Sequence, residues 1–181
     1  MKFLYLLPLL IVTSVSCQET RDTIMEKQIT LWSSNFTPGD SIPLAHTCKG
    51  EERSPHLMWE KGPETTKSYC MIMTDRDAPI PLLTITHWIV YNIPADCTSL
   101  HEGLSVKQGN GGGMQFGKRF SGKHRYLGPC PPFGVHRYFF TLYALDTTLT
   151  VKPAKATRRT IMRAIKGHII ALGEMYGTFS K

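Results

Sequence analysis

The sequence lacks most of the short motifs that mark nucleotide, redox and hydrolase sites. It contains no Cys-x-x-Cys pair, no Gly-x-Ser-x-Gly elbow, and no glycine-rich loop followed by Lys-Ser or Lys-Thr. These absences argue against a zinc ribbon or thioredoxin-like site, a serine hydrolase and a P-loop nucleotide site. The formal charge is +7, but the chain has no recognition module and no basic stripe with interleaved aromatic residues. We therefore expect no nucleic-acid partner.

The longest apolar run lies at the start of the chain and is short. It extends from Phe3 to Val12 behind Lys2, and small residues lead from it to Cys17. A run of this length does not span a bilayer as a stable helix, and this order is typical of a secretory signal peptide. Residues 1–16 are therefore predicted to be a signal peptide.

The residues around Cys17 also resemble a bacterial lipoprotein acylation site, because small residues precede the cysteine. Acylation of Cys17 would anchor the protein, since two or more acyl chains hold a protein at a membrane lastingly. We expect an exported protein, which is either periplasmic, a membrane-anchored lipoprotein, or secreted. The polar residues 17–28 are predicted to be a flexible tether, and residues 29–181 a single domain.

Beyond residue 28, short runs rich in β-branched and aromatic residues alternate with glycine and proline. This rhythm is typical of an antiparallel sandwich and not of alternating strands and helices. The predicted strands are residues 29–33, 57–59, 69–74, 84–93 and 138–146. The fold class is therefore predicted to be mainly β.

One helix is predicted late in the chain. Thr157 can cap it, and Gly177 stands beyond its end. Its apolar stripe at helical spacing is formed by Ile161, Ile165, Ile169 and Leu172.

Two carboxylates and two imidazoles lie at the ends of predicted strands. Asp75 and Asp77 are two residues apart, so their side chains would share one side of a continuing strand. His136 stands at the mouth of the run 138–146. Alternation along the run 84–93 places His87 on an apolar face with Ile85, Ile89 and Tyr91. A lone histidine on such a face is usually a core residue, but two histidines and two carboxylates together indicate a polar pocket.

Several short segments follow one another in a characteristic order and spacing. They include Asp75-x-Asp-Ala-Pro79, His87-Trp88, Gly128-Pro-Cys-Pro-Pro132 and Gly134-Val-His-Arg-Tyr138. This series, which runs from about residue 31 to residue 176, resembles the phosphatidylethanolamine-binding protein family, also called the Raf kinase inhibitor protein family, and most closely its bacterial branch. The resemblance implies a two-sheet antiparallel Greek-key sandwich with a C-terminal helix, and a binding role without enzymatic activity.

The resemblance also implies where a ligand binds. The family's pocket corresponds here to Asp75, Asp77, His87, Tyr126, Gly128, Pro132, His136 and Tyr138. An aspartate that accepts a hydrogen bond from an imidazole favours the protonated ring and leaves the other nitrogen to donate to an anion. We expect a phosphate-bearing or anionic ligand, such as phosphate, phosphoethanolamine or a phospholipid head group, with no cofactor and no metal.

Three other functions remain as alternatives. Relatives bind and restrain protein kinases or serine proteases, so inhibition of such a partner is the first. A hydrolase that uses Cys130 or a serine with His136 is the second. A metal site built from the two histidines and two aspartates is the third, although no tight ligand spacing marks it.

Two segments depart from the family pattern, and one is unusually rich in glycine. Arg76 replaces the usual proline between the two aspartates and introduces a cation able to pair with either of them. Residues 123–125 are basic where small residues are common. Residues 109–113 contain four glycines and are predicted to form a mobile flap beside the pocket.

The cysteines after Cys17 allow up to two disulfides in three pairings, and they are Cys48, Cys70, Cys97 and Cys130. An oxidising compartment would favour such bridges. Cys48 and Cys130 lie in motifs that cytosolic relatives share, so they need not be bridged.

Overall fold

The computed structural model of the protein describes residues 27–79 and 84–181. The predicted signal peptide, residues 1–16, and Cys17 lie outside the described residues. The elements, in chain order, are β1 (Lys27–Gln28), β2 (Leu31–Ser33), the 3₁₀ helix η1 (Leu44–His46), β3 (Leu57–Trp59), β4 (Ser68–Asp75), β5 (Ile85–Pro94), β6 (Ser99–Leu100), α1 (Val106–Gly111), β7 (Gln115–Phe116), β8 (Val135–Leu145), the 3₁₀ helix η2 (Pro153–Lys155), α2 (Arg158–Ile165) and β9 (Ile169–Ser180).

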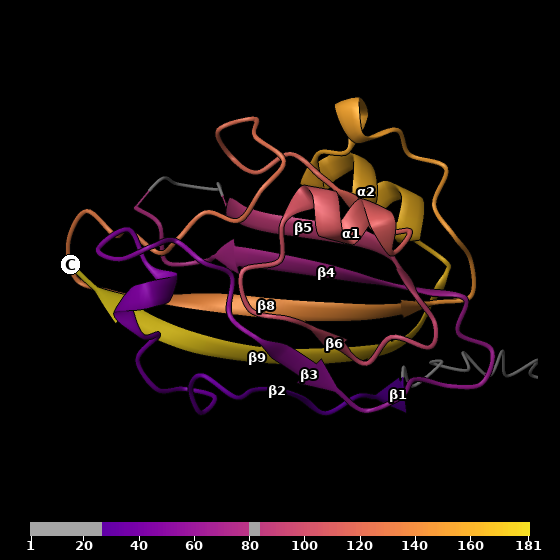
Figure 1. Ribbon diagram of the computed structural model, residues 1–181, viewed down its shortest axis with the longest axis horizontal. Coiled ribbons are helices and arrows are strands. Elements are labelled where there is room, and N and C mark those ends of the chain that lie inside the picture. The colour runs from indigo at the N-terminus through magenta and orange to yellow at the C-terminus, as the bar shows by residue number, and fades with distance from the viewer. Residues whose placement is uncertain (1–26, 80–83) are drawn as a thin grey trace, which may run out of the picture.

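Two sheets form the frame of the molecule. The larger has the strand order β1-β9-β8-β4-β5-β7, and the smaller has the order β2-β3-β6. Figure 1 shows the long strands β4, β5, β8 and β9 side by side across the molecule. All strand pairs are antiparallel except β1 with β9. The predicted mainly β, two-sheet class is confirmed.

Alternation along β4 gives the large sheet two apolar faces. Tyr69, Met71 and Met73 point into the core between the sheets, where they pack with Trp59 of β3 and with residues of β8. The intervening Cys70 and Ile72 face the other side and pack against α2. The large sheet is therefore covered by the small sheet on one face and by α2 on the other.

Helix α2 is shorter than predicted and does not continue into the last stretch of the chain. Thr157 caps it, since its hydroxyl accepts a hydrogen bond from the backbone N–H of Thr160. The helix ends at Ile165, and Gly167 then adopts a left-handed φ of 81°. Ile169 and Leu172, which were predicted to extend the helix, belong to β9.

Several buried positions of strand β9 are occupied by small residues, so its sequence does not show the apolar alternation that is typical of a strand. Every second residue from Ala171 to Phe179 is buried, as a strand requires. Gly177 is one of these residues, and a Cβ at this position would lie 2.5 Å from Ile42 Cγ1. Because glycine contributes no apolar side chain to the pattern, the helical spacing of the isoleucines outweighed the strand signal in the sequence.

The start of the domain also differs from the expectation. Lys27 and Gln28 were predicted to end the flexible tether, but they form β1 and pair in parallel with Ala171 and Leu172 of β9. Backbone hydrogen bonds explain the difference, since the following Ile29 donates its N–H to the Leu172 carbonyl at 2.8 Å. An exposed polar sequence can therefore still add a strand to a sheet edge.

The predicted glycine flap is largely helical. Helix α1 extends through Gly111, and a capping box formed by Ser105 and Gln108 starts it. Gly109 lies so close to the ring of Phe116 that a Cβ would meet it at 2.4 Å. Close packing, and not mobility, accounts for this glycine.

Candidate functional site

A cavity of about 240 Å³ opens where strand β4 ends and strand β8 begins. We call it the His136 cavity. Six of the eight predicted site residues line it: Asp75, His87, Gly128, Pro132, His136 and Tyr138. The cavity is also lined by Ala78, Pro79, Ile85, Leu127 and Cys130, which were not among the predicted ligand-binding residues.

Asp75 and His136 form a buried pair in the wall of the His136 cavity that the large sheet provides. They belong to the adjacent strands β4 and β8, and the Nδ1 atom of His136 lies 2.8 Å from Oδ2 of Asp75. Both side chains are at least nine-tenths buried. The other carboxylate oxygen of Asp75 accepts the backbone N–H of Asp77 at 2.9 Å. Asp75 is thus fixed by two hydrogen bonds and holds the His136 ring in one orientation.

Strand β5 carries a β-bulge at His87. On the neighbouring strand β4, Met73 is opposite Trp88 and Thr74 is opposite Thr86, so His87 is the extra residue between them. A bulge breaks the alternation of side chains along its strand.

Because of this bulge, His87 does not share a face of the strand with Ile89 and Tyr91, as was predicted. Ile85 and His87 line the cavity, whereas Ile89 and Tyr91 belong to the apolar cluster that packs against α2. A regular strand would have kept all four residues on one face. The bulge turns His87 away from that cluster and toward His136.

A backbone carbonyl sets the tautomer of His87. Its Nδ1 atom lies 2.8 Å from the carbonyl oxygen of Leu127. A carbonyl oxygen can only accept, so Nδ1 carries the hydrogen. Burial lowers the pKa of His87, which favours the neutral ring. In that state Nε2 is a hydrogen-bond acceptor.

Tyr138 provides a hydroxyl without a well-aligned partner. The residue is fully buried, and its hydroxyl makes no hydrogen bond of good geometry with any residue in the described part of the chain. Burial raises the pKa of Tyr138, and the nearby Asp75 acts in the same direction, against a smaller opposing effect from the Cys130 backbone, so the hydroxyl keeps its proton. Its ring and the His87 ring are arranged edge to face, with 5.1 Å between the centroids. A buried, unpaired hydroxyl costs stability, and such a cost is common at sites where a ligand supplies the missing partner.

A disulfide fixes the loop on the far side of the cavity. Cys130 is bonded to Cys48, and the backbone N–H of Cys48 donates to the Pro129 carbonyl at 3.1 Å. Gly128 packs so tightly there that a Cβ would lie 2.7 Å from the carbonyl carbon of Thr47. Among the described cysteines, Cys70 and Cys97 are free, so one of the two possible bridges forms.

Asp77 does not line the cavity, contrary to the prediction. Its carboxylate binds the guanidinium of Arg137 through two hydrogen bonds of 2.7 and 2.8 Å and also accepts that residue's backbone N–H. These hydrogen bonds lower the pKa of Asp77 to about 2. Arg137 follows His136 in strand β8, so it points to the opposite face of the sheet. The strand before Asp77 ends at Asp75, so the alternation on which the prediction relied does not continue.

Arg76 and Tyr126 are likewise occupied elsewhere. Arg76 pairs with Glu174 and lies over the ring of Phe139, with the guanidinium carbon 3.9 Å from the ring centroid. It pairs with neither aspartate. The Tyr126 hydroxyl donates to the His46 carbonyl at 2.9 Å, so Tyr126 supports the surrounding structure without lining the cavity.

Neither a metal-binding cluster nor a membrane-spanning helix is found among the described residues. In residues 27–79 and 84–181, no group of three or more His, Cys, Asp and Glu side chains is placed to hold a metal ion. No helix in this part of the chain is long and apolar enough to cross a membrane.

Comparisons with known proteins agree with this architecture. A profile of the family described as phosphatidylethanolamine-binding protein matches residues 32–180. The UPF0098 protein of Methanothermobacter thermautotrophicus is 40% identical over 146 residues, which cover 81% of this chain and 95% of that protein. The UPF0098 protein of Pyrococcus abyssi is 40% identical over 184 residues, with 98% of each chain covered.

Two solved structures are similar along most of their length. A putative phosphatidylethanolamine-binding protein homologue from Chlamydia trachomatis has a TM-score of 0.77 at 34% identity, covering 86% of this chain and 99% of its own. YbcL of Escherichia coli, described as a new member of the mammalian PEBP family, has a TM-score of 0.78 at 27% identity, covering 84% and 98%.

Proposed function

The chain belongs to the phosphatidylethanolamine-binding protein family, which supports a binding function, and we propose that it binds a small phosphate-bearing or other anionic ligand in the His136 cavity. The observation that carries this proposal is the buried hydroxyl of Tyr138, which has no well-aligned hydrogen-bond partner and lies beside the Asp75–His136 pair in the same cavity. A buried polar group without a partner is rare, and a ligand oxygen would remove its cost.

The polar groups of the cavity differ in what they offer a ligand. The Tyr138 hydroxyl can donate, and a protonated His136 ring can donate from Nε2 while Nδ1 is held by Asp75. Neutral His87 offers Nε2 as an acceptor. A monoprotonated phosphate ester has both acceptor oxygens and one O–H donor, whereas a carboxylate has only acceptors. This combination favours a phosphate ester over a carboxylate ligand.

The chemistry of the lining supports binding without turnover. Nucleophilic catalysis by a cysteine requires a thiolate, and the sulfur of Cys130 is bonded to Cys48. The Tyr138 hydroxyl holds its proton, because burial raises its pKa. The hydrolase alternative therefore has no activated nucleophile among the described residues of this cavity.

The test is calorimetric titration of the full chain with phosphoethanolamine, and Tyr138→Phe is the informative variant. This substitution removes only the hydroxyl, so the melting temperature without ligand should stay the same or rise, while affinity falls. A hydrogen bond to a charged group contributes about 1.5–3 kcal/mol, which corresponds to a loss of about tenfold or more. His136→Ala should weaken binding at least as much.

Exposed His101 provides the control, because His101→Ala removes an imidazole that does not line the cavity. Its affinity should equal that of the unsubstituted chain. Unchanged affinity in both cavity variants, with intact melting curves, would move the ligand site out of the His136 cavity.

We also propose that the protein is exported. The Cys48–Cys130 disulfide supports this location, since structural disulfides persist in oxidising compartments. The predicted signal peptide, residues 1–16, is the second support. Intact-mass measurement of protein from the native cell would test both points. A mass that begins at residue 17 with added acyl chains indicates a lipoprotein, and an uncleaved chain with free thiols contradicts export.

A further inference from the structure

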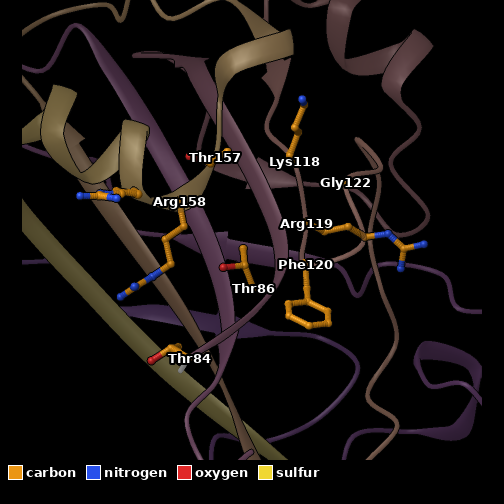
Figure 2. Close-up of a pocket in the computed structure, with 9 residues that line it drawn as sticks. Thr84, Thr86, Lys118, Arg119, Phe120, Gly122, Thr157 and Arg158 are labelled. Atoms are coloured by element: carbon orange, nitrogen blue, oxygen red, sulfur yellow. The ribbon is translucent and has the colours of Figure 1, made fainter. Parts of the chain in front are cut away.

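A second cavity, of about 360 Å³, lies on the other side of strand β5. We call it the Arg158 cavity. It is lined by Thr84, Thr86, Lys118, Arg119, Phe120, Gly122, Thr157, Arg158 and Arg159. Figure 2 shows these side chains around the start of helix α2 and the segment that begins at Lys118. That segment is held in place by backbone hydrogen bonds, from Lys118 to Ala156 at 2.7 Å and from Phe120 to Thr86 at 2.8 Å.

The positive charges around this cavity are not balanced within the described chain. Lys118, Arg158 and Arg159 form no ion pair with a described carboxylate, because every ion pair between described residues joins other side chains. Arg158 and Arg159 also occupy the first turn of α2, which contains no acidic residue. The start of a helix carries partial positive charge, so basic residues there are unfavourable unless an anion compensates them.

Thr86 supplies a buried polar group that faces the cavity. Only 7% of the residue is exposed, and its hydroxyl, which stays accessible from the cavity, makes no hydrogen bond with a described group. In Figure 2 this hydroxyl points toward the side of Arg158, with Phe120 on the other side of Thr86. The guanidinium of Arg119 points away from Thr86, so Arg119 contributes its stem to the wall. The cavity thus combines a fixed hydroxyl with cations on long side chains that are able to turn toward an anion.

We propose that the Arg158 cavity is a second anion site, which takes a multiply charged phosphate group either free or carried by a lipid head group. The Thr86 hydroxyl donates to one oxygen, and the backbone N–H groups of Arg158 and Arg159, which the Thr157 cap leaves free, face the same charge. Arg158 and Arg159 close over the ligand, since a guanidinium binds phosphate through two parallel hydrogen bonds. This site is separate from the His136 cavity, because no residue lines both.

The first test uses inorganic pyrophosphate as the probe and His136→Ala as the background, so that the His136 cavity does not contribute. Calorimetric titration at low salt should still detect one site. Adding Arg158→Ala and Arg159→Ala should weaken it at least tenfold and make it less sensitive to salt. Loss of all pyrophosphate binding in the His136→Ala chain itself would overturn the proposal.

The matched control removes two charges from the other end of the same helix. Arg163→Ala with Lys166→Ala leaves the net charge equal to that of the first double variant, and both residues are exposed. This control should bind pyrophosphate within about twofold of the His136→Ala chain. Equal weakening by both double variants would indicate diffuse attraction and overturn the assignment of a site.

Thr86→Val keeps the charge and nearly keeps the shape, so it tests whether the site is built around the hydroxyl. We expect about fivefold weaker pyrophosphate binding. Unchanged affinity would contradict the role of Thr86 and, with it, the proposed site.

The unliganded protein gives a second readout, since Arg158→Ala with Arg159→Ala should leave the melting temperature unchanged or raised in phosphate-free buffer. A lower melting temperature would assign the two arginines a structural role instead.

Sedimentation with vesicles distinguishes the two sources of phosphate. Vesicles of phosphatidylcholine with one fifth phosphatidic acid present a phosphomonoester, and vesicles of phosphatidylcholine alone do not. If the first vesicles retain the His136→Ala chain and pyrophosphate releases it, the site accepts a lipid head group. If pyrophosphate binds but neither vesicle does, the site accepts the free anion.

Discussion

The two cavities lie on opposite faces of strand β5 and are built in different ways. His87 and Thr86 are neighbours in the sequence, yet His87 lines the His136 cavity and Thr86 lines the Arg158 cavity. In the His136 cavity the polar side chains are buried, and two of them are fixed by hydrogen bonds to Asp75 and to the Leu127 carbonyl. In the Arg158 cavity Arg158 and Arg159 carry their charges on exposed long side chains, whereas Lys118 is half-buried and Arg119 is buried.

This difference indicates two kinds of selectivity. A rigid set of buried donors and acceptors distinguishes ligands by geometry and protonation state, since a wrong ligand leaves a polar group unpaired. Exposed cations distinguish ligands mainly by charge, and their attraction is screened by salt. Affinity at the His136 cavity should therefore vary little with ionic strength, whereas affinity at the Arg158 cavity should fall steeply.

The largest expected effect concerns the disulfide, which fixes only one of the two cavities. Cys48→Ser with Cys130→Ser opens a link between residues 82 positions apart. The entropy of the unfolded chain then rises, and we expect a loss of about 4 kcal/mol in the free energy of unfolding. Urea unfolding measures this loss. Phosphoethanolamine binding should weaken as well, because Cys130 lines the His136 cavity, while pyrophosphate binding measured in the His136→Ala background should not change.

Cys97→Ser serves as the control for the disulfide variant. Cys97 is a partly exposed free thiol, so its loss should change stability by less than about 0.5 kcal/mol. If the double variant weakened both ligands equally, the disulfide would stabilise the whole domain and not the His136 cavity in particular.

Asp75→Asn tests whether orientation by a carboxylate is what makes the His136 cavity selective. The substitution keeps the size of the side chain and removes the charge that holds His136. A hydrogen bond to a charged group contributes about 1.5–3 kcal/mol, so phosphoethanolamine affinity should fall by about 10-fold to 100-fold. Calorimetry measures the change, and pyrophosphate binding at the Arg158 cavity is the internal reference.

The sequence could predict the elements of the His136 cavity that follow regular strand geometry. Asp75 ends β4, while His136 and Tyr138 are two residues apart near the start of β8, so alternation places the latter two on one face. The family motifs added Gly128 and Pro132. These positions depend on local spacing, which a sequence displays directly.

The sequence could not predict features that depend on neighbouring strands. The bulge at His87 is defined by its register with β4, and no residue type in β5 marks it. Asp77 lies beyond the end of β4, so its side chain does not follow the alternation of that strand and binds Arg137 instead. The residues predicted to end the late helix form β9, because they pair with β8 at eleven positions. Each of these outcomes arises from long-range pairing that overrides a local pattern.

The lowered pKa of His87 makes its contribution to the stability of the fold depend on pH. Burial is the largest cause that lowers the pKa of His87, Arg119 acts in the same direction, and Asp75 and Glu52 act against it. Because the folded-state pKa lies below the unfolded value of about 6.5, this residue's contribution to stability is complete above that pH. The contribution is lost as the pH falls from there toward the folded-state pKa.

His87→Gln should therefore flatten the dependence of unfolding free energy on pH between about 7 and 5. A single site changes the slope by at most about 1.4 kcal/mol per pH unit. Urea unfolding at several pH values measures it, with His101→Gln as the surface control. A slope that is the same in the unsubstituted chain and in His87→Gln would show that His87 titrates alike in both states.

The smallest effect is expected at Asp77, which the sequence placed in the pocket and the structure places outside it. Hydrogen bonds from Arg137 lower the pKa of Asp77 to about 2, so the ion pair stabilises the fold above the unfolded value of about 3.9. This stabilisation is lost as the pH falls toward 2. Because the guanidinium is about half exposed, Asp77→Asn should cost no more than about 1 kcal/mol at neutral pH.

Phosphoethanolamine affinity should stay within about twofold in Asp77→Asn, against the large loss in Asp75→Asn. Acid unfolding between pH 5 and 2, with exposed Asp96→Asn as the control, measures the stability term. A loss of ligand affinity as large as that of Asp75→Asn would mean that Asp77 leaves Arg137 and turns into the His136 cavity when a ligand binds. Asp75 and Asp77 would then bind the ligand together. The His136 cavity would be flexible at its rim, and it would no longer differ in this respect from the Arg158 cavity.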